Sequence, residues 1–182
     1  SQLAALTTEQ VQAIGTDDLA ALTSSQLAQM GSTQLAALTT AQVQALETAD
    51  LAAIRSTVIS SLTTEQIDAL TTEQAAALRT SQLAALTTAQ VQAIGTDDLA
   101  VLDTRQVASL TTTQVAALTT AQVDALTTEQ AAALRTTQPL ALNTEQVQAI
   151  GTDDIAALTS LQLANLGSTQ LAALTTAQIQ AL

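Results

Sequence analysis

The sequence predicts an all-α solenoid, a superhelix of very short helices with one helix in each eight-residue repeat. The repeat is the first observation: from Leu6, 22 octads follow one another to Ala181 without insertion or deletion. Each octad reads approximately Leu, Thr, Thr, any residue, Gln, Val or Leu, any residue, Ala, which we number as positions one to eight. The second observation is that position three is Ser or Thr in all 22 octads, and the third is that acidic residues gather at positions four and five.

Two other structures with this period are disfavoured. In a continuous helix an eight-residue repeat makes about 2.2 turns, so an apolar stripe would rotate by ~80° per octad, more than supercoiling absorbs. In a β-solenoid the apolar residues would alternate, whereas positions one, six and eight do not. A string of short helices separated by turns therefore fits the pattern best.

Position three is predicted to cap each helix, because a Ser or Thr hydroxyl at the N-cap accepts a hydrogen bond from an unpaired backbone N–H. Glycine at position two, as in Gly15, would then follow the preceding helix, where positive φ is often needed. A second register places the cap one residue earlier, as a capping box of Thr7 with Gln10. Both registers start a new helix in every octad.

Charges follow the same arrangement. Of the 16 acidic residues, 12 lie at positions four or five, the first turn of each expected helix, where negative charge meets the positive end of the dipole. Arg55, Arg79 and Arg135 lie at position two, which this register places just beyond a helix C-terminus. The only proline, Pro139, would lie in a first turn capped by Thr136, with a local distortion and with Leu140 supplying the lost apolar side chain.

Helices this short are unstable alone, so positions one, six and eight are expected to be buried against neighbouring octads. Glutamine dominates position five, and two interpretations stay open: a hydrogen-bond ladder between octads, or a solvated polar face. A coil of two octads or of three is equally compatible with the sequence.

Composition narrows the function. The chain has no aromatic residue, Cys, His or Lys, and its net charge is −12. This charge disfavours nucleic acid, and the absence of a long apolar run argues against membrane insertion. We expect residues 1–182 to form one continuous array, a segment of a longer array or filament.

An enzyme is not expected, and neither is a cofactor, because His, Cys and Lys are missing and the carboxylates recur with the repeat instead of converging. The sharpest local motif is Gly-Thr-Asp-Asp, which occurs three times from Gly15, Gly95 and Gly151. Paired carboxylates can bind Ca²⁺, but the motif also reads as a helix start with two first-turn acids. The weak metal candidates are Asp17, Asp18, Asp97, Asp98, Asp153 and Asp154.

Runs such as LTTEQVQAIGTDDLAALTSSQLA and LTTAQVQAL resemble the Leu-Thr-Thr-x-Gln-Val-x-Ala arrays of very large bacterial surface or secreted, adhesin-like proteins. The resemblance covers the whole chain, and it implies an extracellular or cell-surface, structural or adhesive role. Some of those proteins carry labels of haem utilisation, for which this chain has no His, Cys or Tyr ligand.

The leading hypothesis is a non-enzymatic structural repeat that forms a rod, stalk or extracellular filament, with copies of itself as partners through end-to-end or lateral assembly. The alternative is a solenoid binding module whose polar column presents an extended face to a protein or glycan. A ligand footprint on the irregular octads at residues 54–61 and 134–141 would favour this alternative. A designed consensus array is a third possibility, and exposed Thr-Thr pairs are candidate sites of O-linked sugar.

Overall fold

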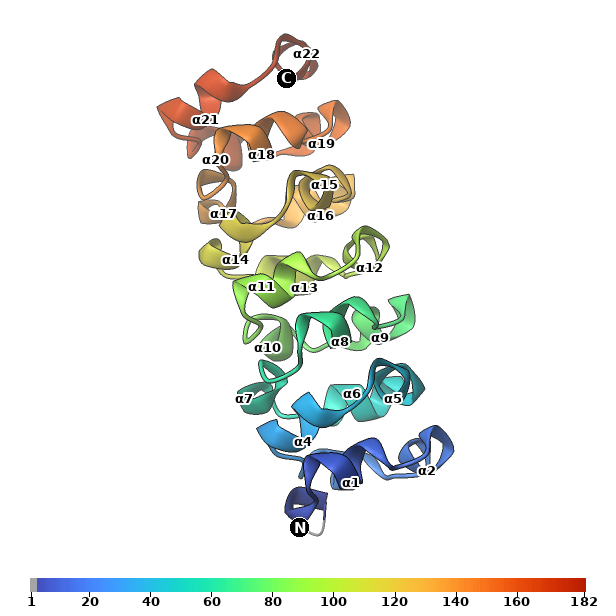
Figure 1. Cartoon of the computed structure of the whole chain (residues 1–182). Coiled ribbons are helices and arrows are strands. Elements are labelled where there is room, and N and C mark those ends of the chain that lie inside the picture. The colour runs from blue at the N-terminus through green and yellow to red at the C-terminus, as the bar shows by residue number, and fades with distance from the viewer. Residues whose placement is uncertain (1–2) are drawn as a thin grey trace. The chain divides into compact units, whose positions relative to one another are not determined.

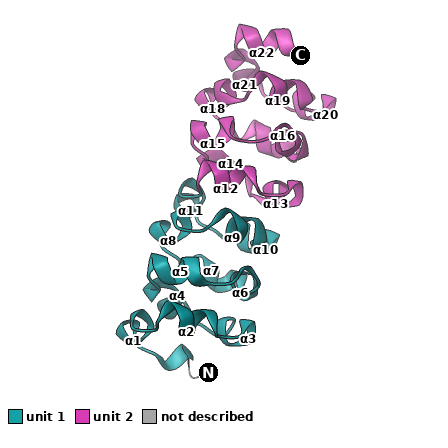
Figure 2. Cartoon of the chain, turned by 90° about the vertical axis from the view of Figure 1, so that its right-hand side faces the viewer, with its two compact units in different colours: residues 1–94 teal, residues 95–182 magenta. Residues whose placement is uncertain are grey.

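The computed structural model describes residues 3–182, in which short helices follow one another and no strand is found (Figure 1). The chain divides into two compact units, residues 1–94 and 95–182, each of which we describe by itself (Figure 2). The first unit contains η1 (Leu3–Ala5), α1 (Thr8–Gln12), α2 (Thr16–Ala20), α3 (Ser24–Leu27), α4 (Ser32–Ala37), α5 (Thr40–Ala45), α6 (Thr48–Ala53), α7 (Ser56–Ile59), α8 (Thr64–Asp68), α9 (Thr72–Ala77), α10 (Thr80–Leu83) and α11 (Thr88–Gln92). The second contains α12 (Thr96–Ala100), α13 (Thr104–Ser109), α14 (Thr112–Ala117), α15 (Thr120–Asp124), α16 (Thr128–Ala133), α17 (Thr137–Leu140), α18 (Thr144–Ala149), α19 (Thr152–Ala157), α20 (Ser160–Ala164), α21 (Ser168–Ala173) and α22 (Thr176–Ala181).

Each octad from Leu6 onward forms one helix, as the sequence predicts. Thr40, Thr48 and Thr64 each begin a new helix, and the backbone just before them is extended. Helices of four to six residues cannot stand alone, so their stability comes from packing against neighbours. The all-α solenoid is therefore confirmed.

Within each unit a helix packs on the helix three places further along the chain. In the first unit α1 contacts α4, α2 contacts α5 and α3 contacts α6, and Figure 1 shows α4, α7 and α10 in one column. In the second unit α13 packs on α16 and α16 packs on α19. One coil of the superhelix therefore contains three octads, a number that the sequence left undecided.

The helix caps lie one residue earlier than the leading sequence register placed them. The N-cap of α5 is Thr39, at position two, with extended backbone angles of φ −73° and ψ 159°, and Thr40 is the first helical residue. The competing capping-box register is thus correct. Glycine at position two is also an N-cap, and no glycine in residues 3–182 has positive φ, so the expected helix-terminating role was wrong.

The buried positions are one, five and six. Around α5, Gln42, Val43 and Leu46 are buried, whereas Ala45, at position eight, is half-buried. The expectation of burial at position eight was therefore only partly right, and position five, for which the sequence left a ladder and a solvated face open, is buried. The physical reason is that position eight lies at the helix end beside the turn, whereas positions five and six point into the contacts between coils.

The octad with Pro139 shows the expected local distortion. Its N-cap, Thr136, has helical angles of φ −51° and ψ −27° and makes no side-chain cap. Pro139 itself is buried, whereas Leu140 is 46% exposed, so Leu140 does not replace the lost apolar side chain. In other octads the position-six N–H donates to the position-two carbonyl, as that of Val147 does to Asn143 at 2.9 Å. Pro139 has no N–H to make this bond, and the Arg135 carbonyl accepts the N–H of Gln138 at 2.8 Å instead.

Each coil has two unlike faces. Position six of the first three octads (Val11, Leu19 and Leu27) is buried, although no octad of the described chain precedes η1, so these side chains point toward the following coil. Position five of the same octads is exposed, whereas in the later octads it is buried, except at Gln170, which is half-buried. Position five therefore points toward the preceding coil, and the solenoid has a direction.

Candidate functional site

The glutamines at position five form the most specific polar arrangement in the molecule. In α5, the Oε1 atom of Gln42 accepts the backbone N–H of Thr39 at 2.8 Å, and the Thr39 hydroxyl accepts the N–H of Gln42 at 3.2 Å. The Nε2 atom of Gln42 donates to the carbonyls of Val11 and Ile14 at 2.8 and 2.7 Å, at the end of α1. One side chain therefore satisfies backbone groups at the start of its own helix and at the end of a helix in the preceding coil.

The same register recurs through both units, from a glutamine to the carbonyls 31 and 28 residues earlier. Together with Gln42 we call these residues the amide ladder: Gln66, Gln74, Gln82, Gln130, Gln138, Gln146, Gln162 and Gln178. Of the two interpretations left open for position five, the hydrogen-bond ladder is the correct one. Because the ladder is buried, it does not form the extended polar face that the binding-module alternative requires.

One octad has neither Gln nor Asp at position five, and a side chain from another position of that octad makes the contact. Val58 stands at position five of α7, so no amide is available there. The guanidinium of Arg55, at position two of the same octad, donates instead to the carbonyl of Met30 at 3.2 Å, which lies 28 residues before Val58. The sequence predicted that arginines at position two lie at the C-terminal end of a helix. Arg55 does so at a helix of the neighbouring coil, and Arg55 itself is the N-cap of α7.

Aspartate replaces glutamine at position five in four octads, and it changes the partner. A carboxylate has no amide to donate, so it accepts instead. Asp50 Oδ1 accepts the Ser24 hydroxyl at 2.6 Å, and Asp154 Oδ1 accepts the Thr128 hydroxyl at 2.9 Å, both from position three of the helix in the preceding coil. The hydrogen bond between coils is kept, but the preceding coil now provides the donor and the following coil provides the acceptor.

The weak metal candidates lie at the first turns of α2, α12 and α19. The first aspartate of each motif is exposed: Asp17, Asp97 and Asp153. The second is buried at Asp98 and Asp154, so in α12 and α19 the two carboxylates point in different directions. In the second unit α12 packs on α15, whereas α19 packs on α16 and α22, so the two motifs of this unit are not brought together. No group of three or more metal-binding side chains occurs in residues 3–182.

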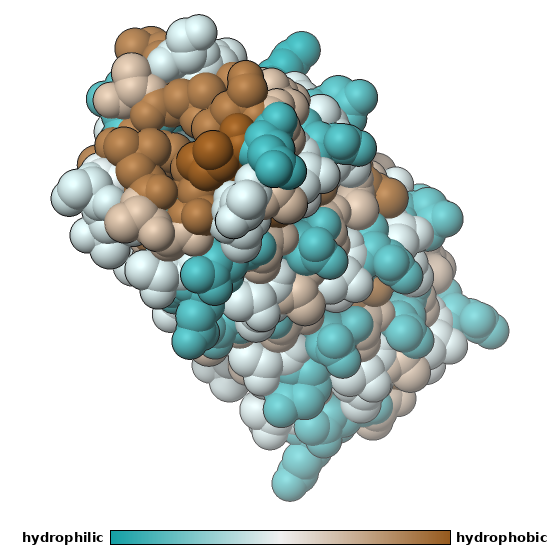
Figure 3. All heavy atoms as spheres, turned by 90° about the horizontal axis from the view of Figure 1, so that it is seen from above, coloured by the Kyte–Doolittle hydropathy of each residue, from teal (hydrophilic) through white to brown (hydrophobic). Residues whose placement is uncertain are grey.

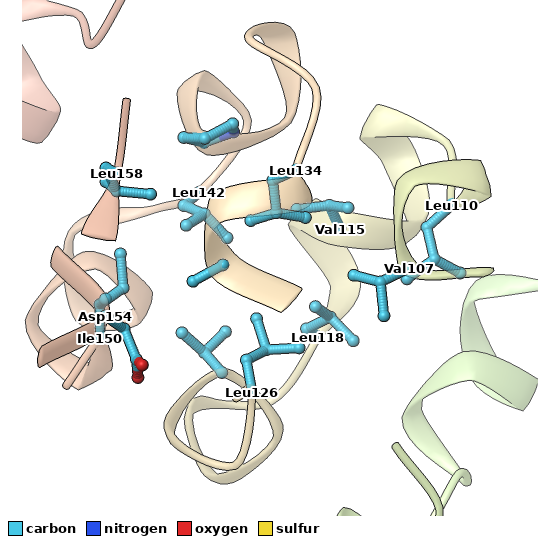
Figure 4. A pocket seen from close by; sticks show the side chains of 13 residues that line it. Val107, Leu110, Val115, Leu118, Leu126, Leu134, Leu142, Ile150, Asp154 and Leu158 are labelled. Carbon is cyan, nitrogen blue, oxygen red and sulfur yellow. The ribbon is translucent and has the colours of Figure 1, made fainter. Parts of the chain in front are cut away.

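A narrow cavity of about 20 Å³ lies in the core of the second unit (Figure 4). Its walls are the apolar side chains of positions one and six from successive coils, including Val115, Leu126 and Leu142, with Asp154 at one side. The small side chain of Ala131, at a position that is usually Val or Leu, accounts for part of the space. A space of this size holds no more than a water molecule, so it is a packing defect and not a ligand site.

Two exposed first-turn acids have perturbed acidities. The pKa of Glu65 lies below its ordinary value of 4.5, mainly because the carboxylate accepts its own backbone N–H and also the Thr63 hydroxyl. The pKa of Glu73 is lowered in the same way by its backbone N–H and by Thr71. These acids support the prediction that position four lies in the positive first turn of each helix.

A signal for the buried ladder was present in the sequence. Position five is Gln in 17 octads and never Glu, although Glu occurs five times at the adjacent position four. A solvated first turn accepts Glu as readily as Gln, so the absence of Glu indicates that position five is not a solvated one. The sequence held no such indication for Arg55. Its partner, the Met30 carbonyl, can be identified only when the number of octads per coil is known to be three.

Comparison with known proteins agrees with this repeat. The model of a family described as the ALTTAQ repeat matches residues 11–47, 43–80, 76–112, 108–136 and 147–182. The six letters of that description occur literally at residues 37–42. None of the curated proteins compared with the chain matches it.

Proposed function

Because this chain belongs to the ALTTAQ repeat family, we propose that it is a non-enzymatic structural segment, a rod-like spacer, stalk or filament section of a bacterial surface or secreted protein. The observation that carries this proposal is the amide ladder. Its glutamines, which would otherwise be the main polar groups available for binding, are used to join each coil to the next. A chain built in this way gains length by adding octads, and each added coil brings the same junction.

Electrostatics suits the same role. Acidic residues recur along the exposed position four, as in Glu65, Glu73 and Glu129, and the net charge is −12. Like charges along the sides of neighbouring molecules oppose lateral aggregation and favour solubility. No helix in residues 3–182 has the length and apolarity that a membrane span needs.

Small-angle X-ray scattering of the purified chain tests the structural role. We expect a maximum dimension several times the cross-section, and a compact globular particle would contradict the proposal. Deleting residues 46–69 removes three octads and keeps the octad frame, so the particle should shorten with an unchanged cross-section. Deleting residues 46–65 breaks the frame and should instead unfold the junction, which makes it the matched control.

The surface location is tested separately on cells that produce the protein. Antibody labelling or protease treatment of intact cells should reach the repeat if it is displayed or secreted. Labelling only after lysis would refute the proposed location while leaving the structural role untouched.

A further inference from the structure

The acidic residues of the second unit follow the three-octad period of the coil. They lie in the octads of three pairs of neighbouring helices: α12 and α13, α15 and α16, and α18 and α19. The octad that follows each pair, which forms α14, α17 or α20, carries none. The ladder connects these three octads, because Gln138 donates to the Leu110 carbonyl and Gln162 to the Leu134 carbonyl, each at 2.7 Å. The column of α14, α17 and α20 is therefore free of carboxylates (Figure 1).

The outward side chains of this column form an uncharged stripe. Positions four and seven lie on one face of a helix, because they are three residues apart. In α14, α17 and α20 all six of these side chains are exposed, and we call them the neutral stripe: Thr113, Ala116, Thr137, Leu140, Leu161 and Ala164. At the same two positions, each acid-bearing octad of this unit has at least one charged residue. The only charged residue in the three octads of the column is Arg135, whose guanidinium donates to the Leu110 carbonyl at 3.0 Å.

Two large apolar side chains of the neutral stripe are exposed. Leu140 is 46% exposed and Leu161 is 62% exposed. In the 22 octads Leu161 is the only large apolar residue at position four, and Leu140 is the only one at position seven. Hydrophilic side chains recur along the flank of the molecule, so exposed leucines are exceptions on it (Figure 3). Both exceptions lie in the column that lacks carboxylates.

The exposure of these leucines belongs to the outer side of the solenoid. The coil that follows α17 is present, and Leu140 stays exposed although its Cδ1 atom lies so close to α21 that a Cβ on Gly167 would come within 3.2 Å of it. Position four is exposed also in octads that have a coil on both sides, as at Glu129 and Glu145. The neutral stripe is therefore not a surface that stacking of further coils would cover.

A second copy of the chain is the partner whose chemistry fits this stripe. Each copy has a net charge of −12, so two copies repel each other where their acid-bearing columns meet. The neutral stripe has no such repulsion, and its leucines supply apolar surface that a contact removes from water. An identical stripe covers leucines with leucines, whereas an acid-bearing column would bring them against carboxylates that need hydration.

We propose that two copies of this chain pair laterally, neutral stripe against neutral stripe. The inference rests on the proposed structural role, and it identifies the side on which two such molecules meet. The contact is isologous, because the same residues lie on both copies, and it closes at a dimer. The acid-bearing columns then lie on the outside of the pair and oppose further lateral growth. With six residues on each side the interface is small, so pairing is weak and depends on concentration.

Sedimentation velocity of the whole chain, from micromolar to millimolar concentration, tests the pairing. We expect the average mass to rise from that of a monomer to that of a dimer and no further. Added salt should strengthen pairing, because it screens the repulsion between copies of charge −12. A monomer at every concentration, or growth beyond a dimer, overturns the inference. The structural role is judged separately, because an elongated monomer in scattering would still support it.

Single substitutions identify the stripe. Leu140→Glu and Leu161→Glu each place a carboxylate in the contact of two like-charged copies, and each should raise the dissociation constant by about tenfold or more. The matched control is Val101→Glu, because Val101 is 45% exposed but lies at the end of α12, an acid-bearing helix. This control should pair like the unmodified chain, and an equal loss of pairing in all three variants would overturn the inference.

A second set of variants leaves the leucines in place. Thr137→Glu introduces into the stripe the acid that position four carries in several other octads, so the helix itself should tolerate it. Ala121→Glu makes the corresponding change at position four of α15, which already carries Asp124. Thr137→Glu should weaken pairing and Ala121→Glu should not. Equal weakening would show that net charge, and not the stripe, controls association.

Mixing distinguishes a stripe-to-stripe contact from docking of the stripe on another side. The variant with both Leu140→Glu and Leu161→Glu is labelled with a fluorophore at its N-terminal amine and sedimented with an excess of unmodified chain. It should stay monomeric, because an isologous contact needs an intact stripe on both copies. If the variant joins the unmodified chain as tightly as that chain joins itself, the stripe docks on another side and the inference is wrong. Circular dichroism of each variant checks that its helices are retained.

Discussion

The guanidinium of Arg55 donates to the backbone carbonyl of Met30 over 3.2 Å, and it does so in the one octad of the ladder region where Val58 replaces glutamine. A side chain three residues before the vacant position thus reaches the carbonyl that the missing amide would have bound. Arg135 makes the same contact, to the Leu110 carbonyl at 3.0 Å, in an octad that keeps Gln138, so an arginine at position two can reach this carbonyl whether or not the amide is present. A carbonyl that loses its only donor costs about 1–3 kcal/mol, and in the octad of Val58 the donor to the Met30 carbonyl is Arg55.

Arg55→Ala is therefore expected to lower the free energy of unfolding by about 1–3 kcal/mol, because the Met30 carbonyl loses its donor. Urea unfolding followed by circular dichroism measures the change. The control is Arg79→Ala, since in that octad Gln82 itself donates to the Ile54 carbonyl at 2.8 Å. Adding Val58→Gln to Arg55→Ala should restore stability, and a failure of this rescue would show that Arg55 acts in another way.

The ladder glutamines provide a second prediction. Gln74 is buried, and its Nε2 donates to the carbonyls of Val43 and Leu46 at 2.8 and 2.7 Å. Gln74→Glu keeps the capping oxygen but loses the donor, so we expect a loss of about 2–4 kcal/mol at neutral pH. Gln44→Glu, at the exposed position seven, makes the same chemical change and should cost less than about 0.5 kcal/mol.

The same variant has an expected pH dependence. Burial raises the pKa of the introduced carboxyl at residue 74, and in its protonated form it regains a hydrogen-bond donor. The difference from the unmodified chain should therefore shrink as the pH is lowered and grow as the pH rises. An equal deficit at pH 4 and pH 7 would contradict the view that the amide donor is what matters at this position.

The sequence predicted the one-helix octad and its charge pattern because caps and first-turn acids act within a few residues of chain. It left the coil at two or three octads because the deciding contacts join residues such as Gln42 and Ile14, which are 28 positions apart. The cap was placed at the invariant Thr40 although the structure uses Thr39. Position two tolerates Arg because the glutamine oxygen accepts the backbone N–H of the residue that stands there, as at Arg79 and Arg135.

In the candidate site, too, local features could be predicted from the sequence and long-range contacts could not. First-turn placement of Asp17 and Asp18 could be predicted locally, whereas the partner of Asp50 depends on which helix of the preceding coil lies beside α6. Nothing in the local sequence connects Ser24 with Asp50. Long-range partners follow from the octad pattern only after the number of octads per coil is known.

Asp50 and Ser24 give a third prediction, in the form of a double-mutant cycle. The hydroxyl of Ser24 donates to Asp50 Oδ1 at 2.6 Å, a charge-assisted bond. Ser24→Ala, Asp50→Asn and the double variant should reveal a coupling of about 1–2 kcal/mol in urea unfolding. Thr128 and Asp154 repeat the pair in the second unit and should give a coupling of the same sign. Additive effects would mean that the bond does not stabilise the junction.

Acid sensitivity is the fourth prediction, and its sign follows from the lowered pKa values of Glu65 and Glu73. Both carboxylates are held in the charged form by helix-start hydrogen bonds, so their contribution is complete above the unfolded pKa of about 4.5 and is lost as the pH falls through the lower folded pKa. The melting temperature can be measured by thermal unfolding between pH 7 and pH 2.5. At neutral pH the unmodified chain should melt at a higher temperature than the variant that carries both Glu65→Gln and Glu73→Gln. The two melting curves should converge in acid, because the protonated carboxyls resemble the introduced amides. A gap that stays constant down to pH 2.5 would mean that these carboxylates act through something other than their charge.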